Sequence, residues 1–131
     1  MISKDRYEEI GAAIVDAAYH VHRELGPGLL ESVYEICMIE ELKERGLLVE
    51  NQVRIPVFYK GKELRKDFIV DILVEDLIIV ELKAVEDLLP VHEVQLVTYL
   101  KLADKHLGFL INFNVSLIKS GIKRKINGYI L

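Results

Sequence analysis

Two side chains of opposite charge stand two residues apart in an apolar stretch of the sequence. Glu81 and Lys83 belong to the run Ile-Ile-Val-Glu-Leu-Lys at residues 78–83. The apolar residues around them predict a central β-strand over residues 77–83, and the two-residue period of a strand directs both side chains to the same face. Because a buried, unpaired ion costs several kcal/mol, this pair requires a partner, a metal ion or a function.

A third charged side chain, Asp71, lies ten residues before Glu81 in another mostly apolar segment. The hairpin between them decides whether the two carboxylates face each other. A two-residue loop would set Asp71 against Val80, whereas a three-residue loop over Glu75–Leu77 would set it opposite Glu81. We therefore predict an odd-length loop or a bulge, because bulges commonly redirect side chains beside active sites.

Three such side chains suit metal-dependent hydrolysis of a phosphodiester bond. Asp71 and Glu81 offer hard oxygen ligands for Mg²⁺ or Mn²⁺, and the other octahedral positions are left to water and phosphate oxygens. The metal ion would lower the pKa of a bound water and neutralise charge that develops on the phosphate. Lys83 would orient the attacking water and stabilise the pentavalent oxyanion. The alternative for a Glu-x-Lys pair is a cross-strand ion pair without chemistry.

Helical periodicity covers most of the first 50 residues. Apolar side chains recur at helical spacing over residues 5–25 and again over residues 29–45. The tripeptide Gly-Pro-Gly at residues 26–28 separates the two helices, because glycine permits unusual backbone conformations and proline removes a hydrogen-bond donor. Gly46 is a natural end for the second helix.

Beyond this point the apolar period falls to two. It predicts strands over residues 48–59, 64–74 and 77–83, with a hairpin turn at residues 60–62. Pro56 favours an edge position for the first of these strands.

The rest of the chain completes an α/β pattern. Pro90 opens a third helix that extends to about residue 104, a buried strand follows over residues 107–113, and one or two short edge strands are expected after it. The order α-β-β-β-α-β, with an extra N-terminal helix, predicts a mixed central sheet flanked by helices in a single domain over residues 1–131. No linker or internal repeat interrupts it.

Composition limits the class of protein. A chain of 131 residues that is 51% hydrophobic can bury one core without disulfides. The single cysteine, Cys37, lies in an apolar helical stretch, which favours a small buried hydrophobe and a reducing, cytoplasmic setting. The sequence shows neither a secretory leader nor an apolar run long enough to cross a bilayer, so we expect no membrane partner.

Charge is distributed unevenly along the chain. The net charge of −4 argues against unspecific coating of nucleic acid. Residues 1–50 carry eleven acidic and five basic side chains, whereas residues 51–131 carry ten acidic and twelve basic. Two basic clusters in the later part are candidate nucleic-acid contacts, with solvated strand and hairpin faces as the alternative. The first comprises Arg54, Lys60, Lys62, Arg65 and Lys66, and the second Lys119, Lys123, Arg124 and Lys125.

Residues 28–34, Gly-Leu-Leu-Glu-Ser-Val-Tyr, read Gly-x-x-Glu-x-x-Tyr and resemble the signature of the GxxExxY proteins, a family placed among the PD-(D/E)xK nucleases. The resemblance extends over most of the chain and implies a restriction-endonuclease-like core. It makes Asp71, Glu81 and Lys83 the counterparts of the D and (D/E)xK positions. Val70 replaces the proline of the superfamily name, which is not a metal ligand.

The resemblance also implies two further site residues, Glu31 as an additional acidic group at the metal and Gln95 as a catalytic residue that reaches the same cleft. The residues themselves leave alternatives open. Glu31 lies in the first turn of its helix, where the helix dipole favours a carboxylate without any catalytic role. Tyr34 shares that face. One alternative is that its hydroxyl forms a hydrogen bond to Glu31 or to a nucleic-acid phosphate. The other is that its ring is packed and its hydroxyl finds a partner within the protein. For Gln95 the alternative is a buried helix-sheet hydrogen bond.

The sequence thus predicts a divalent-metal-dependent nuclease, with DNA as the expected substrate. A noncatalytic nucleic-acid- or protein-binding module with the same fold is one alternative, and a structural homodimeric domain that pairs sheet edges is another. The set of Asp71, Glu81 and Lys83 favours the enzyme, because a binding module has little reason to hold two carboxylates against a phosphate backbone. A homodimer or a protein partner would help a mildly acidic chain of this size to grip its substrate.

Overall fold

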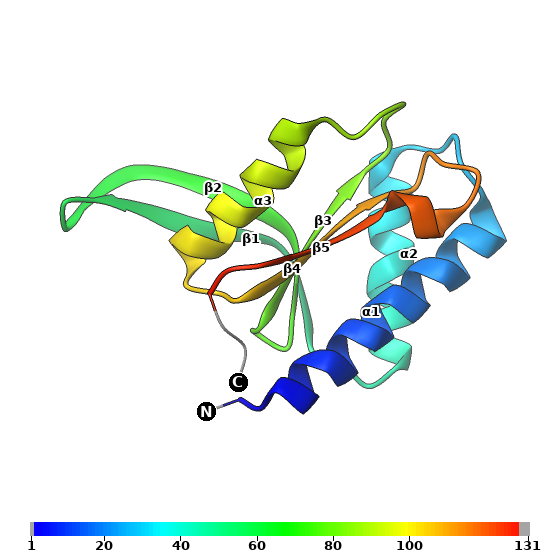
Figure 1. The fold of residues 1–131 in the computed structure, drawn as a ribbon, viewed down its shortest axis with the longest axis horizontal. Helices are drawn as coiled ribbons and strands as arrows, with labels where there is room; N and C mark the ends of the chain where they lie inside the picture. The colour runs from blue at the N-terminus through cyan, green and yellow to red at the C-terminus, as the bar shows by residue number, and fades with distance from the viewer. Residues whose placement is uncertain (1, 129–131) are drawn as a thin grey trace.

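The elements of the fold follow the order predicted from the sequence. The computed structural model describes residues 2–128 (Figure 1). None of the described helices is long and apolar enough to span a membrane. The predicted bounds of the helices and strands differ from the observed ones by at most two residues. The helices are α1 (Lys4–Leu25), α2 (Glu31–Glu44) and α3 (Pro90–Ala103), and the strands are β1 (Val49–Tyr59), β2 (Lys62–Val74), β3 (Ile78–Lys83), β4 (Leu107–Asn112) and β5 (Ile122–Ile126), with a short 3-10 helix, η1 (Ile118–Gly121), before β5.

The five strands form one mixed sheet in the order β1-β2-β3-β4-β5. Neighbouring strands are antiparallel except for β3 and β4, which are parallel and are connected through α3. As predicted from Pro56, β1 lies at an edge, and a bulge between Pro56 and Phe58 interrupts its pairing with β2. The topology confirms the predicted α/β fold with helices around a mixed sheet.

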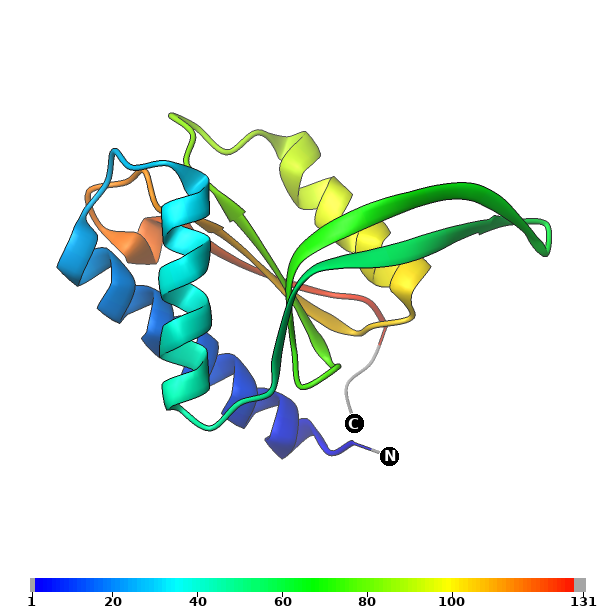
Figure 2. The same ribbon diagram turned by 180° about the vertical axis from the view of Figure 1, so that it is seen from behind.

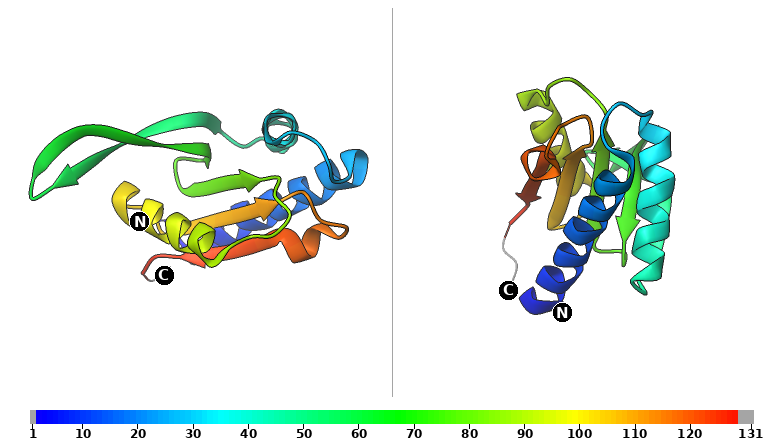
Figure 3. Two further views of the ribbon diagram at one scale, coloured as in Figure 1. Left: turned by 90° about the horizontal axis from the view of Figure 1, so that it is seen from above. Right: turned by 90° about the vertical axis from the view of Figure 1, so that its right-hand side faces the viewer.

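Helices cover both faces of this sheet (Figure 3). On one face, α1 and α2 pack against a core that includes Val80 and Leu82 of β3. On the other face, α3 packs against a second core that includes Ile79. Since side chains alternate along a strand, Glu81 and Lys83 point to the α3 side together with Ile79.

A three-residue loop, Glu75–Leu77, joins β2 to β3. Of the residue pairs that β2 and β3 form, Ile72 with Val80 is the one farthest from this loop. The same register places Asp71 opposite Glu81. The predicted odd-length loop is therefore confirmed.

Contacts from three distant segments hold this loop in place. The Glu75 carboxylate accepts hydrogen bonds from the Arg6 guanidinium at 2.7 Å and from the Leu48 N–H at 2.5 Å. The Lys105 ammonium donates to the carbonyl oxygen of Asp76 at 2.8 Å and to its carboxylate at 3.2 Å. Glu75 and Asp76 both have left-handed backbone, with φ of 54° and 53°, a conformation that such contacts must stabilise.

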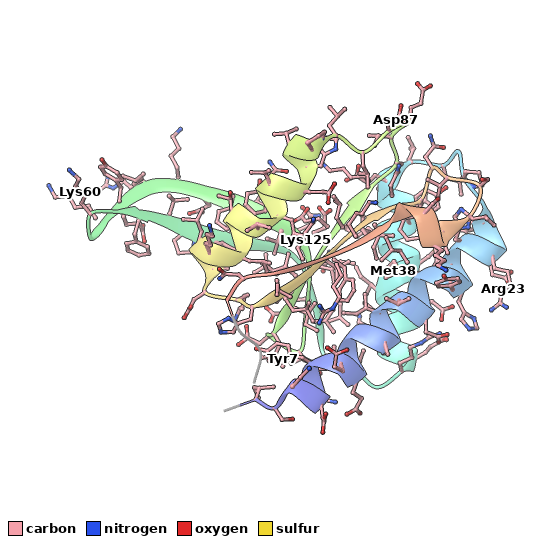
Figure 4. The ribbon with its side chains drawn as sticks, in the orientation of Figure 1. Tyr7, Arg23, Met38, Lys60, Asp87 and Lys125 are labelled. Atoms are coloured by element: carbon pink, nitrogen blue, oxygen red, sulfur yellow. The ribbon has the colours of Figure 1, made fainter. Side chains whose placement is uncertain are left out.

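The hairpin of β1 and β2 extends beyond the rest of the protein (Figures 1 and 2). We refer to residues 54–67 as the arm. Its turn consists of Lys60 and Gly61, whose φ values of 50° and 79° match the tight two-residue turn that suits the twist of a hairpin. Lys60 marks the tip of the arm in Figure 4. Residues 58–67 are all exposed.

Candidate active site

The strands β2 and β3 part where their two carboxylates meet. Next to the last backbone pair, the Asp71 N–H donates to Oε1 of Glu81 at 3.3 Å, and the Leu82 N–H donates to Oδ2 of Asp71 at 2.8 Å. Each carboxylate thus accepts a hydrogen bond from the backbone of the opposite strand. The geometry brings Asp71 and Glu81 together as the register predicted.

Nearby positive charge does not balance the negative charge of the carboxylate pair. Burial, followed by the charge of Asp71 and hydrogen bonding with it, raises the pKa of the Glu81 carboxyl to about 9. The charge of Lys83 acts in the opposite direction but does not cancel these effects. Two carboxyls in such a place either share a proton or bind a cation.

Lys83 ends β3 beside this pair and is half-buried. Its charge lowers the pKa of both Glu81 and Glu31, which places the ammonium within electrostatic reach of both carboxyls. The Lys83 carbonyl accepts a hydrogen bond from the Phe113 N–H at 3.0 Å, so the end of β4 fixes the backbone from which the ammonium extends.

Glu31 approaches the same charges from the other layer of the fold. It is the first residue of α2 and is exposed. Partial desolvation of the carboxyl first, and the charge of Asp71 second, raise the pKa of Glu31. The charge of Asp71 therefore reaches Glu31, as a shared site requires.

A further carboxylate at this place, Glu35, was not predicted. It lies one helical turn after Glu31, and its pKa is raised by burial and by the charge of Asp71. The Gln52 side chain donates a hydrogen bond to Glu35 at 2.7 Å. The four-residue spacing from Glu31, which puts both on one helix face, is the signal that could have identified it.

Tyr34, the last residue of the Gly-x-x-Glu-x-x-Tyr motif, has a structural role in place of the predicted contact with nucleic acid. Its side chain is fully buried and stacks on Phe113 with ring centroids 4.4 Å apart. The hydroxyl donates to the Gly26 carbonyl at 2.6 Å and accepts from the Leu29 N–H at 3.2 Å. Tyr34 thereby fixes the turn before α2 to the core, and this turn positions Glu31 at the start of the helix.

On the α3 side, Tyr99 contributes a hydroxyl whose place at the site does not follow from the sequence. Its ring stacks on Phe68 at 4.2 Å. Burial and then the charges of Glu81 and Asp71 raise the pKa of the Tyr99 hydroxyl. Gln95, one turn earlier, is exposed and forms no side-chain hydrogen bond within residues 2–128, so the alternative of a buried helix-sheet bond is wrong. Its catalytic role stays a prediction.

A buried amide, Asn112, supports the end of β3 and was also not predicted. Its Oδ1 accepts hydrogen bonds from the N–H groups of Val85 at 3.0 Å and Asn114 at 3.2 Å, and its Nδ2 donates to the Val85 carbonyl at 2.9 Å. Asn112 pairs with Lys83 across the parallel strands. It therefore fastens the segment that follows Lys83 to β4.

The acidic groups fit part of a metal centre. Asp71 and Glu81 supply two adjacent carboxylates, as a hard divalent cation requires, with water and phosphate oxygens as further ligands. Among the residues that the structure describes, no three His, Cys, Asp or Glu side chains come close enough together to hold a metal ion. The ligand role of Glu31 therefore stays a prediction.

The two basic clusters differ in how much of their charge is already paired. In the second cluster, Arg124 forms an ion pair with Glu8 at 3.0 Å and Lys125 with Glu93 at 2.6 Å. In the first cluster, Arg54 lies 3.3 Å from Asp67, whereas its other four members, Lys60, Lys62, Arg65 and Lys66, form no ion pair within the described part of the chain. The first cluster is thus the more available to a polyanion.

Comparison with known proteins agrees with this fold. The family model of the PD-(D/E)XK nuclease superfamily matches residues 8–125. No curated protein and no solved structure matches the chain. Because the match spans most of the chain, the protein belongs to the PD-(D/E)XK nuclease superfamily. Its mixed sheet and three described helices are consistent with the restriction-endonuclease-like fold of these proteins, which generally use divalent metal ions.

Replacement of Tyr34 by Phe tests the motif tyrosine. The stacked ring stays in place, but the Gly26 carbonyl and the Leu29 N–H lose their partner, so we expect the free energy of unfolding to fall by about 1–3 kcal/mol in urea denaturation. The matched control is Tyr19→Phe, because Tyr19 is exposed on α1, and its effect should stay within about 0.5 kcal/mol. Equal effects of the two substitutions would contradict the structural role of the Tyr34 hydroxyl.

The raised pKa of Glu81 predicts how stability depends on pH. The folded protein keeps the Glu81 proton until the pH approaches about 9, whereas the unfolded chain loses it near the ordinary pKa of a glutamate, so this contribution to stability is complete at acid pH and is lost as pH rises. Glu81→Gln keeps a neutral side chain throughout. Relative to the wild type, its free energy of unfolding should therefore rise with pH by up to about 1.4 kcal/mol per pH unit.

Urea denaturation in the presence of a chelator, over a series of pH values from mildly acid to mildly alkaline, measures this difference. Asp71→Asn is the companion variant, since it removes a charge that raises the pKa of Glu81 and should flatten the wild-type profile. Parallel profiles for the wild type and Glu81→Gln would show that the Glu81 carboxyl does not titrate as the geometry requires.

Proposed function

We propose that the protein is a divalent-metal-dependent nuclease that hydrolyses phosphodiester bonds, with DNA as its substrate. The observation that carries the proposal is the adjacent placement of Asp71 and Glu81 where β2 and β3 part, with backbone N–H groups bonded to both carboxylates. A buried pair of this kind is unfavourable without a proton or a cation. Mg²⁺ or Mn²⁺ is the cation whose ligand preference the pair meets.

Each residue of the site has a role that its charge explains. A bound divalent ion supplies an activated water and charge neutralisation at the phosphate. Asp71 and Glu81 hold the ion, and the Lys83 ammonium orients the nucleophile and stabilises negative charge in the transition state. Glu31 and Gln95 complete the proposed site, Glu31 from the first turn of α2 and Gln95 from α3.

We further propose that the chain belongs to the GxxExxY branch of the superfamily. Gly28 has a φ of 98°, in the region that favours glycine. Glu31 is coupled to Asp71 through charge, and Tyr34 fastens the turn before α2, which contains Gly28. Glycine, glutamate and tyrosine of the motif thus each have a physical reason for their type and spacing.

Cleavage assays test the nuclease activity. Purified protein should cleave DNA in Mg²⁺ or Mn²⁺ but not in chelator, and Asp71→Asn, Glu81→Gln and Lys83→Ala should each reduce the rate by about 100-fold or more, because each removes a charge at the reacting phosphate. Single- and double-stranded DNA and RNA are compared in the same assay. Glu40→Gln, an exposed carboxylate elsewhere on α2, is the matched control and should retain activity.

Metal binding separates this proposal from a noncatalytic module with the same fold. Mn²⁺ should raise the melting temperature of the wild type but not of Asp71→Asn, since an ion that binds only the folded state stabilises it. Cleavage that persists in folded Asp71→Asn and Lys83→Ala would refute the assignment. Nucleic-acid binding without cleavage and without a Mn²⁺ shift would favour the binding module.

A further inference from the structure

The tip of the arm carries aromatic and apolar side chains that are about half exposed. Phe58 is 56% exposed and Tyr59 is 61% exposed. Leu64, on the returning strand, is 47% exposed. The tip of the arm extends away from the rest of the protein (Figures 2 and 4), and none of these three side chains belongs to either core. Exposed rings on such an element indicate a binding surface.

The charge of the arm is opposite to that of the whole protein. Five basic side chains, Arg54, Lys60, Lys62, Arg65 and Lys66, stand among two acidic ones, Glu63 and Asp67. The single ion pair within the arm joins Arg54 to Asp67. An excess of unpaired cations on a chain with a net charge of −4 creates a local attraction for a polyanion.

Rings and cations are interleaved at the tip. The Lys60 ammonium lies 5.4 Å from the centroid of the Tyr59 ring, and Phe58 precedes that ring in the same strand. Basic groups beside exposed aromatic faces are the combination that binds single-stranded nucleic acid, because the bases stack on the rings while the cations contact the phosphates. Bases inside a duplex have no free face to offer.

A second copy of the chain is a poorer occupant of this surface. β1 is an edge strand, but Pro56 lacks a backbone donor and the bulge between Pro56 and Phe58 interrupts the row of groups that another strand would pair with. Two arms of the same positive charge would also repel each other. Both features disfavour pairing between copies and leave the arm to a partner of negative charge.

We propose that the arm is a second nucleic-acid-binding site that holds an unpaired stretch of the substrate, with Tyr59 and Phe58 stacked on bases and Lys60, Lys62 and Lys66 on phosphates. This proposal rests on the proposed nuclease function, because the unpaired stretch belongs to the same nucleic acid that the active site would cleave. From Asp71 to the start of β2 at Lys62 the strand rises by roughly 30 Å, at about 3.3 Å per residue. At 3.4 Å per step, that corresponds to about nine nucleotide steps of a duplex.

Fluorescence anisotropy with one labelled oligonucleotide, as a single strand and as a blunt duplex, tests the stacking part. Tyr59→Leu and Phe58→Leu keep an apolar side chain but remove the ring face. Each should weaken single-strand binding by at least about fivefold and leave duplex binding within about twofold, because a stacked base contributes a factor of that size or more. Tyr19→Leu, which removes an exposed ring on α1, is the matched control and should bind as the wild type does.

The charge part is tested by the dependence of binding on salt. Lys62→Gln combined with Lys66→Gln should lower the slope of log K against log salt by about 1.4 for the single strand, at about 0.7 per phosphate contact. The matched control combines Lys43→Gln with Lys101→Gln, two exposed lysines outside the arm, and should leave the slope unchanged. Circular dichroism melts confirm that all variants fold.

These measurements are made in chelator, so that they do not depend on cleavage, and Asp71→Asn should bind both oligonucleotides at least as well as the wild type. If the nuclease proposal fails, no cleavage is seen in metal ions while the effects of the arm variants on binding persist. The arm proposal is overturned if Tyr59→Leu and Phe58→Leu bind the single strand like the wild type or lose affinity equally for the duplex. It is also overturned if light scattering shows that these variants change the oligomeric state instead.

Discussion

The register between β2 and β3 is the constraint on which the candidate site depends. A strand has a period of two, so a loop one residue shorter would turn Asp71 away from Glu81 and place an apolar residue in its stead. The three-residue loop carries two residues with left-handed backbone, and ion pairs from α1 and from the segment before β4 hold it. Contacts at one end of the strand pair thus decide which side chains meet at the other end.

The meeting of the two carboxylates then imposes its own requirement on the surroundings. Burial and mutual charge favour a neutral Glu81, and Lys83 offsets only part of that cost. Further carboxylates on α2 add to the negative potential, since the charge of Asp71 reaches both Glu31 and Glu35. An arrangement with so many acids and one lysine is poorly suited to bind phosphate by itself, and a divalent cation would reverse the sign of the local potential.

The sequence predicted those features that depend on neighbours along the chain or across one hairpin. The helices and strands follow from periodicity, and the meeting of Asp71 with Glu81 follows from counting residues in a loop. It did not predict the positions of Glu35, Tyr99 and Asn112, because these depend on how helices seat on the sheet and on contacts between distant segments. For Tyr34, the pattern was recognised, but the burial of its ring against Phe113 depends on a partner about 80 residues away, which no local pattern reveals.

The opposite charges of the two ends of β2 have a consequence for how a nuclease of this shape would select its substrate. At one end the strand contributes Asp71 to an acidic centre that repels phosphate until a cation is bound, and at the other end it passes through a basic arm that attracts phosphate at all times. Affinity without metal would therefore come from the arm, and metal binding would add the contact at the scissile bond. Because one continuous strand joins the two, the arm of such a nuclease would fix the distance along the nucleic acid at which the acidic centre acts, and the rigidity of the hairpin would determine how sharply that distance is defined.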